Sequence, residues 1–84
     1  MPADIMEEQL LVALRTDAVL AAAGCAADAA EQIGIIVRRG PHYRGAWYWQ
    51  HDSFSFTPAG YGESTCQART VGEALVLTRQ LALK

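Results

Sequence analysis

The chain has few cysteines and no long apolar run, and each shortage excludes a class of protein. Its 84 residues include only two cysteines, Cys25 and Cys66, whereas a small secreted domain held by disulfides has roughly four to eight. We therefore expect two reduced, buried thiols. The longest apolar stretch, Ala18 to Ala27, has ten residues. A helix needs about 20 to span a bilayer, so we predict no contact with a membrane.

A basic N-terminal segment is also missing. The chain begins Met-Pro-Ala-Asp and continues to Glu7 and Glu8, whereas a secretory signal starts with basic residues and then turns apolar. We therefore expect a cytoplasmic protein. A hydrophobic content of 51% and a charged content of 19% are typical of a globular chain, and the length predicts one domain over residues 1–84.

Patterns that support catalysis or metal binding are absent too. No histidine or cysteine pair has the spacing of a metal site. His51, Asp52 and Ser53 are neighbours in a turn, so they cannot converge as base, orienting acid and nucleophile. We therefore expect no enzymatic activity, no metal, no cofactor and no small-molecule ligand.

The net charge of −2 conceals an uneven distribution. Residues 1–34 carry six acidic side chains and one arginine, a net charge of −5, whereas residues 35–84 carry six basic and three acidic side chains, a net charge of +3. This asymmetry indicates either a basic binding face or two halves that lie against each other and neutralise one another. The second interpretation is the ordinary one for acidic helices packed on a mixed sheet.

The first forty residues show a helical pattern. One face of a first helix carries Met6, Leu10, Ala13 and Leu14. Thr16 or Asp17 is placed to cap a second helix. Its end would be Arg38-Arg39-Gly40-Pro41, which has the bases, the glycine and the proline of a helix stop. The β-branched run Ile33–Val37 also fits a strand, so one or two N-terminal helices remain open, although the stop signal favours a helix.

The middle of the chain predicts an antiparallel hairpin. Gly45–Gln50 and Ser53–Thr57 are strand-forming segments joined by a two-residue turn. In the register set by that turn, four aromatic side chains share one face and the polar side chains share the other, and a one-residue slip would mix them. The aromatic set, which we expect in the core, is Trp47, Trp49, Phe54 and Phe56.

A third strand and a C-terminal helix complete the predicted fold. Small and polar residues alternate over Ser64–Arg69, and Thr70 and Glu73 match a capping box for a helix that runs to about Leu83. The expected inner stripe of this helix is Val71, Ala74, Leu75, Thr78 and Leu81. The predicted class is α+β: an N-terminal helix or helix pair, a three-stranded antiparallel sheet (a β-hairpin plus one strand), and a C-terminal helix packed on the same sheet face.

This order of elements, with Gly60-Tyr61-Gly62 before the last helix, resembles the double-stranded RNA-binding domains. In that family the last helix begins with lysines that contact phosphates. Here it begins Val71-Gly72-Glu73, and Arg69 is the only base nearby. The resemblance therefore concerns topology and implies no RNA binding.

The most distinctive segment is Arg38–His51, which has three arginines, two histidines, four aromatic residues and no acid. Arginine and tyrosine are enriched at protein-binding hot spots, bases interleaved with aromatic rings suit single-stranded nucleic acid, and the segment also fits a purely structural role. With both tryptophans in the core, the expected contact residues are Arg38, Arg39, His42, Tyr43, Arg44 and Tyr48.

The predicted function is a non-enzymatic protein–protein interaction module, a small accessory, regulatory or inhibitor-type protein. Its contacts would come from the loop around Arg38–Arg44 and the polar sheet face with Tyr48. The partner would be another protein or a second copy of the chain. The alternative is a nucleic-acid-binding domain that uses Arg38, Arg39, Arg44 and the exposed tyrosines.

Overall fold

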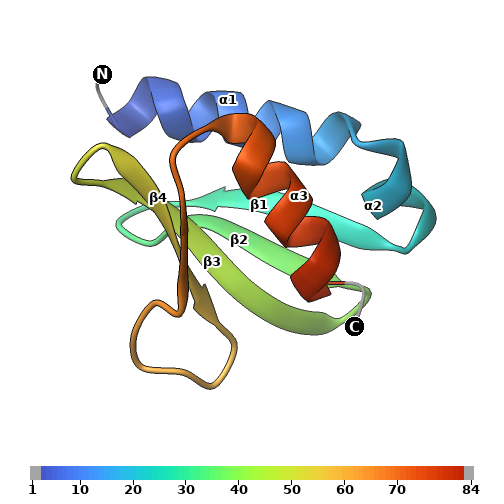
Figure 1. The fold of residues 1–84 in the computed structure, drawn as a ribbon. Helices are drawn as coiled ribbons and strands as arrows, with labels where there is room; N and C mark the ends of the chain where they lie inside the picture. Colours follow the sequence, from blue (N-terminus) through green and yellow to red (C-terminus); the bar gives the residue numbers. More distant parts are fainter. Residues whose placement is uncertain (1–2, 83–84) are drawn as a thin grey trace.

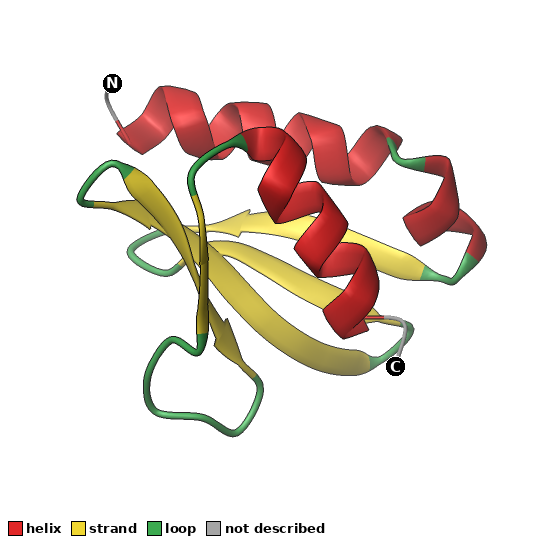
Figure 2. Ribbon diagram, in the orientation of Figure 1, coloured by secondary structure: helices red, strands yellow, loops and turns green. Residues whose placement is uncertain are grey.

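A five-stranded antiparallel sheet and three helices form two layers (Figure 1). The structure is a computed structural model that describes residues 3–82. The elements are α1 (Ala3–Thr16), α2 (Ala18–Ala22), β1 (Cys25–Ala30), β2 (Gly34–Arg39), β3 (His42–Gln50), β4 (Ser53–Pro58), β5 (Cys66–Ala68) and α3 (Val71–Ala82). The strands lie in the sheet in chain order, each antiparallel to the next. The helices lie on one face, and within residues 3–82 no helix covers the other (Figure 2).

The prediction of a three-stranded sheet was wrong, because the chain forms two further strands before the expected hairpin. β1 and β2 occupy most of the segment that the sequence pattern assigned to a second helix. Only Ala18–Ala22 of that segment is helical, and its N-cap is Asp17, whose carboxylate accepts a hydrogen bond from the Leu20 amide at 3.0 Å. Of the run that fitted either state, Ile33–Val37, Ile33 lies in a turn and the other four residues belong to β2. The five strands also depart from the three-stranded order on which the resemblance to RNA-binding domains rested.

The error arose at Gly40, because a helix end and a hairpin turn both need a residue with positive φ. Gly40 has φ +59°, but it turns β2 into β3 rather than ending a helix. The sequence pattern did not predict β1 for a different reason. Alanine is depleted in strands, and β1 reads Cys-Ala-Ala-Asp-Ala-Ala. It forms through its pairing with β2, in which Ala27 lies opposite Val37.

The hairpin of β3 and β4 has the predicted register. Trp47 lies opposite Phe56, and Trp49 lies opposite Phe54. Trp47, Phe54 and Phe56 are at most 2% exposed, and Trp49 packs half-buried at the margin of this cluster. The aromatic face of the hairpin therefore forms the centre of the core, as expected.

α3 begins as predicted, and its Thr78 hydroxyl accepts a hydrogen bond from the Trp47 ring in the core. The Glu73 amide donates to Thr70 Oγ1 (3.1 Å), and the Glu73 carboxylate accepts from the Arg69 amide (2.8 Å). Ala74 and Thr78 are buried, and Val71, Leu75 and Leu81 pack against the core. The predicted end at Leu83 lies outside the described residues.

α1 presents its predicted apolar stripe to the core, with Leu10 and Leu14 buried and Met6 packed beside them. Over residues 3–82, no helix has the length and apolar character needed to cross a membrane.

Candidate functional site

The segment Arg38–Arg44, expected as a loop, is a tight hairpin with a bulge. Val37 lies opposite Gly45, but the next pair is Arg38 with Tyr43, so β3 holds one extra residue, Arg44. A bulge of this kind redirects a side chain. Arg38 and Tyr43 consequently share the uncovered face of the sheet with Tyr48, whereas Arg44 turns toward the helices.

Arg39 and Arg44 both reach the C-terminal end of α3. Arg44 Nη2 donates to the Leu81 carbonyl at 3.2 Å, and Arg39 Nη1 donates to the Ala82 carbonyl at 3.5 Å. The last carbonyls of a helix have no partner within it and carry partial negative charge. The two arginines therefore stabilise the end of α3, and both are half-buried. His42, opposite Arg39 at the hairpin end, is exposed.

Arg38 forms an ion pair with Asp28 on the uncovered face, and Arg15 Nη2 lies 3.3 Å from the same carboxylate. The hydrogen bond from Arg38, with a smaller contribution from Arg15, holds the pKa of Asp28 below its ordinary value. Arg79 and Asp17 form another ion pair, which likewise holds the pKa of Asp17 below its ordinary value. Acids of the first 34 residues thus pair with bases of the later segment, which supports the interpretation that the two halves neutralise one another.

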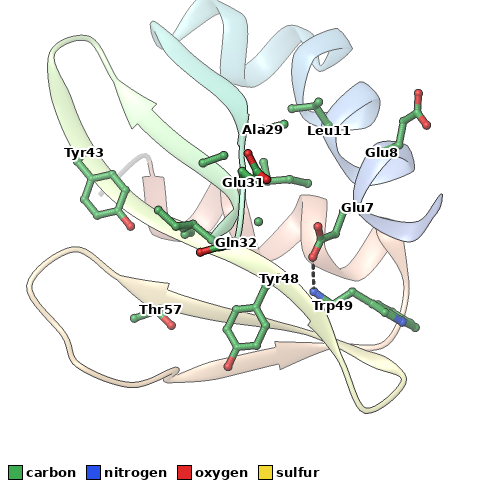
Figure 3. Close-up of a pocket in the computed structure, with 15 residues that line it drawn as sticks. Glu7, Glu8, Leu11, Ala29, Glu31, Gln32, Tyr43, Tyr48, Trp49 and Thr57 are labelled. Carbon is green, nitrogen blue, oxygen red and sulfur yellow. Dashed lines mark hydrogen bonds between the residues drawn. The ribbon is translucent and has the colours of Figure 1, made fainter. Parts of the chain in front are cut away.

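A groove opens where the β1–β2 hairpin and the β3–β4 hairpin diverge (Figure 3). The last pair between β2 and β3 is Ile35 with Trp47, yet β3 continues to Gln50. The turn at residues 31–33 forms one side of the groove, β3 forms the other, and the first half of α1 lies at its end. The volume is about 1080 Å³.

Gly34, the first residue of β2, allows β2 to start in close contact with β3. It has φ +108°, and a Cβ atom there would lie 2.1 Å from the Trp47 carbonyl oxygen and 2.9 Å from Tyr48 Cβ. Only a residue without a side chain fits so close to β3. Gly34 thereby fixes the position along β3 at which the β1–β2 hairpin separates from it.

Glu7 supplies a hydrogen-bond acceptor to β3 beyond the end of β2. The Trp49 amide donates to Glu7 Oε2 at 2.8 Å (Figure 3). The carboxylate thus provides the acceptor that a neighbouring strand would otherwise offer. This contact ties the first half of α1 to β3 at the end of the groove.

The groove combines acids with aromatic rings. Its walls hold three carboxylates and no basic side chain, so its formal charge is −3, and the three rings belong to Tyr43, Tyr48 and Trp49. Both tyrosines are among the contact residues predicted from the sequence, but the acids, Glu7, Glu8 and Glu31, are not. Residues 31–32 had been assigned to a helix, and no sequence signal placed them opposite β3.

A second, more polar hollow of about 720 Å³ lies on the other side of Tyr48. Its lining includes hydroxyl and amide side chains of the uncovered face, among them Gln50, Ser53, Ser55 and Gln67. Tyr48 lines both hollows. Its ring therefore stands between the acidic groove and a polar hollow that is also lined by Asp52, Arg69 and Glu73.

Over residues 3–82, no three His, Cys, Asp or Glu side chains are placed to hold a metal ion. Cys25 and Cys66 are free thiols that are half-buried, less than expected. Burial raises the pKa of the Cys66 thiol, so the thiol is protonated at neutral pH.

The chain was compared with models of protein families, with curated proteins and with solved structures, and none of the three comparisons found a match.

Proposed function

We propose that this chain is a non-enzymatic protein-binding module that takes a protein partner on the uncovered face of its sheet, around Tyr43 and Tyr48. The observation that carries the proposal is the composition of that face, where two tyrosines stand among small hydroxyl and amide side chains. Tyrosine supplies contact area at low entropic cost and serine supplies adaptable hydrogen bonds, which is why binding surfaces use both.

Tyr48 is the expected centre of the interface. It is half-buried and borders both hollows, so a partner that fills either hollow contacts its ring. Tyr43, 45% exposed, and Arg38 extend the same surface toward the β2–β3 turn. Residues that dominate binding are typically large, central and partly enclosed, and Tyr48 has these properties.

The nucleic-acid alternative has less support. It depends on Arg38, Arg39 and Arg44 as phosphate contacts, but Arg38 already pairs with Asp28 and the other two donate to carbonyls at the end of α3. A phosphate would have to replace those contacts. The acidic groove beside Tyr48 would repel it as well.

Affinity capture with variants of matched chemistry tests the proposal. The double variant Tyr43→Ala/Tyr48→Ala should lose a partner protein that the wild type retains. Tyr61→Ala should retain it, because Tyr61 is exposed in the 59–65 loop and borders neither hollow. Circular dichroism verifies that all three proteins fold.

Three results would contradict the proposal: capture of nothing, equal capture by every variant, or a signal that disappears after nuclease treatment. Sedimentation of the purified protein distinguishes a second copy from another protein as the occupant. A dimer that dissociates in the double variant would assign the face to self-association.

A further inference from the structure

We infer that the groove between the two hairpins receives an extended, basic segment of the partner protein, with arginine or lysine side chains against Glu31, Glu8 and the Tyr48 ring. This inference rests on the proposed function and adds the chemistry of the partner to it. The shape of the groove, its charge and its aromatic rings support such an occupant.

The shape suits a peptide segment better than a small molecule. Small-molecule sites enclose most of the ligand surface, whereas this groove, of about 1080 Å³, lies open between the β1–β2 and β3–β4 hairpins (Figure 3). A segment laid along it would follow β3 past the end of β2. The Trp49 amide already donates to Glu7, so recognition there would depend on side chains rather than on an added strand.

The charge selects a cationic occupant. Glu7, Glu8 and Glu31 line the groove, and within residues 3–82 no arginine or lysine pairs with any of them. The arginines nearest in sequence pair with Asp28 instead. Complementary charge across an interface guides association and rejects partners of the wrong sign.

The rings and apolar side chains of the groove fit the remainder of a basic segment. Arginine stacks on tyrosine and tryptophan faces, and both Tyr48 and Trp49 border the groove. Ile33, 50% exposed, and Leu11 offer apolar contacts. Glu31 lies on the same turn as Ile33, and Glu8 lies on the same helix as Leu11, so a segment that combines basic and apolar residues would match both the turn and α1.

A titration followed by NMR tests the inference. The probe is an eight-residue peptide of alternating arginine and valine, added to the isotope-labelled full chain, and the matched control replaces every arginine with glutamate. The arginine peptide should shift amide signals at residues 30–34 and 48–50, with an affinity that falls as salt rises. The glutamate peptide should shift none of them.

Charge-removing variants identify the acids responsible. Glu8→Gln/Glu31→Gln should weaken binding of the arginine peptide about tenfold. Glu63→Gln should leave it unchanged, because Glu63 is exposed but lies outside the groove. Glu7 is kept, since it holds the Trp49 amide.

The inference is overturned if the arginine peptide produces no shifts at millimolar concentration, if its shifts fall elsewhere, or if the double glutamine variant binds it as well as the wild type. These outcomes are separable from a failure of the proposed function. A partner protein that is lost in Tyr43→Ala/Tyr48→Ala but retained by Glu8→Gln/Glu31→Gln would support the proposed function and contradict the basic segment in the groove. Peptide binding without any captured protein would contradict the proposed function alone.

Discussion

Trp47 brings a polar N–H group into an otherwise apolar core, and one hydroxyl satisfies it. Trp47 Nε1 donates to Thr78 Oγ1 at 2.8 Å, and that hydroxyl donates to the Ala74 carbonyl at 2.7 Å. Both side chains are almost fully buried. We predict that Thr78→Val lowers the free energy of unfolding by about 1–3 kcal/mol, the cost of a buried donor without an acceptor. Urea denaturation measures it. Thr78→Ser, which keeps the hydroxyl, should lose clearly less, and equal losses would contradict the role of the hydrogen bond.

Asp17 acts on two helices at once, as the N-cap of α2 and as the partner of Arg79 on α3. The hydrogen bond from Arg79 holds the pKa of Asp17 below its ordinary value of 3.8. The unfolded chain therefore takes up this proton first, and the stabilisation by the carboxylate is present at neutral pH and lost as the pH falls through the folded-state pKa. Asp17→Asn keeps the capping oxygen but removes the charge.

We predict that Asp17→Asn unfolds at lower urea concentration than the wild type at pH 7, and that the difference shrinks as the pH falls below about 4. Asp28 titrates in both proteins, so it cancels in the comparison. A difference that stays constant from pH 7 to pH 2.5 would show that the charge of Asp17 contributes nothing.

At the scale of elements, two glycines with positive φ allow the energetic cost of an unfavourable backbone conformation to be measured apart from the cost of a steric clash. Gly40 has φ +59° and open space where a Cβ atom would lie, whereas at Gly34 a Cβ atom would meet the Trp47 carbonyl oxygen. We predict that Gly40→Ala costs about 1–2 kcal/mol for the left-handed conformation alone, and that Gly34→Ala costs roughly 1–3 kcal/mol more because of the clash. Thermal and urea unfolding of both variants measure the two costs. Equal losses would mean that β2 has room to move away from β3.

The elements that were predictable are those whose side chains differ in kind between two faces. The β3–β4 register followed from Trp47, Trp49, Phe54 and Phe56, since any slip would have placed rings among polar side chains. β1 carries no such contrast, because five of its six residues are small and apolar. Its alanines fit a helix as well, and only pairing with Ile35 and Val37 of β2 decides the outcome. Local sequence does not contain that tertiary information.

The candidate site was predictable in part for the same reason. The hairpin register placed Tyr48 on the uncovered face, and the structure agrees. The groove depends on two features without a local signature: the end of the β2–β3 pairing at Ile35 and the contact between Glu7 and the Trp49 amide, which joins residues 42 positions apart. The bulge at Arg44, which turns one predicted contact residue toward α3, was equally invisible before the pairing of β2 with β3 was known.

At the scale of the whole molecule, the core draws on every element. Its buried residues come from the three helices and all five strands, and Trp47 lies among them in contact with Phe54 and Phe56. Loss of that ring should therefore weaken both layers together rather than release one element. A chain of this length is stabilised by roughly 4–13 kcal/mol in total.

We predict that Trp47→Ala lowers the free energy of unfolding by roughly 3–5 kcal/mol, with helix and sheet signals lost in one transition at a much lower temperature. Trp49→Ala is the matched control. Its ring is half-buried at the margin of the core and contacts Phe54, so its removal should cost less and leave the transition near that of the wild type. Thermal unfolding followed by circular dichroism in the far and near ultraviolet measures both variants. If Trp47→Ala melts at the wild-type temperature, or the helices melt separately from the sheet, the two layers do not share one core.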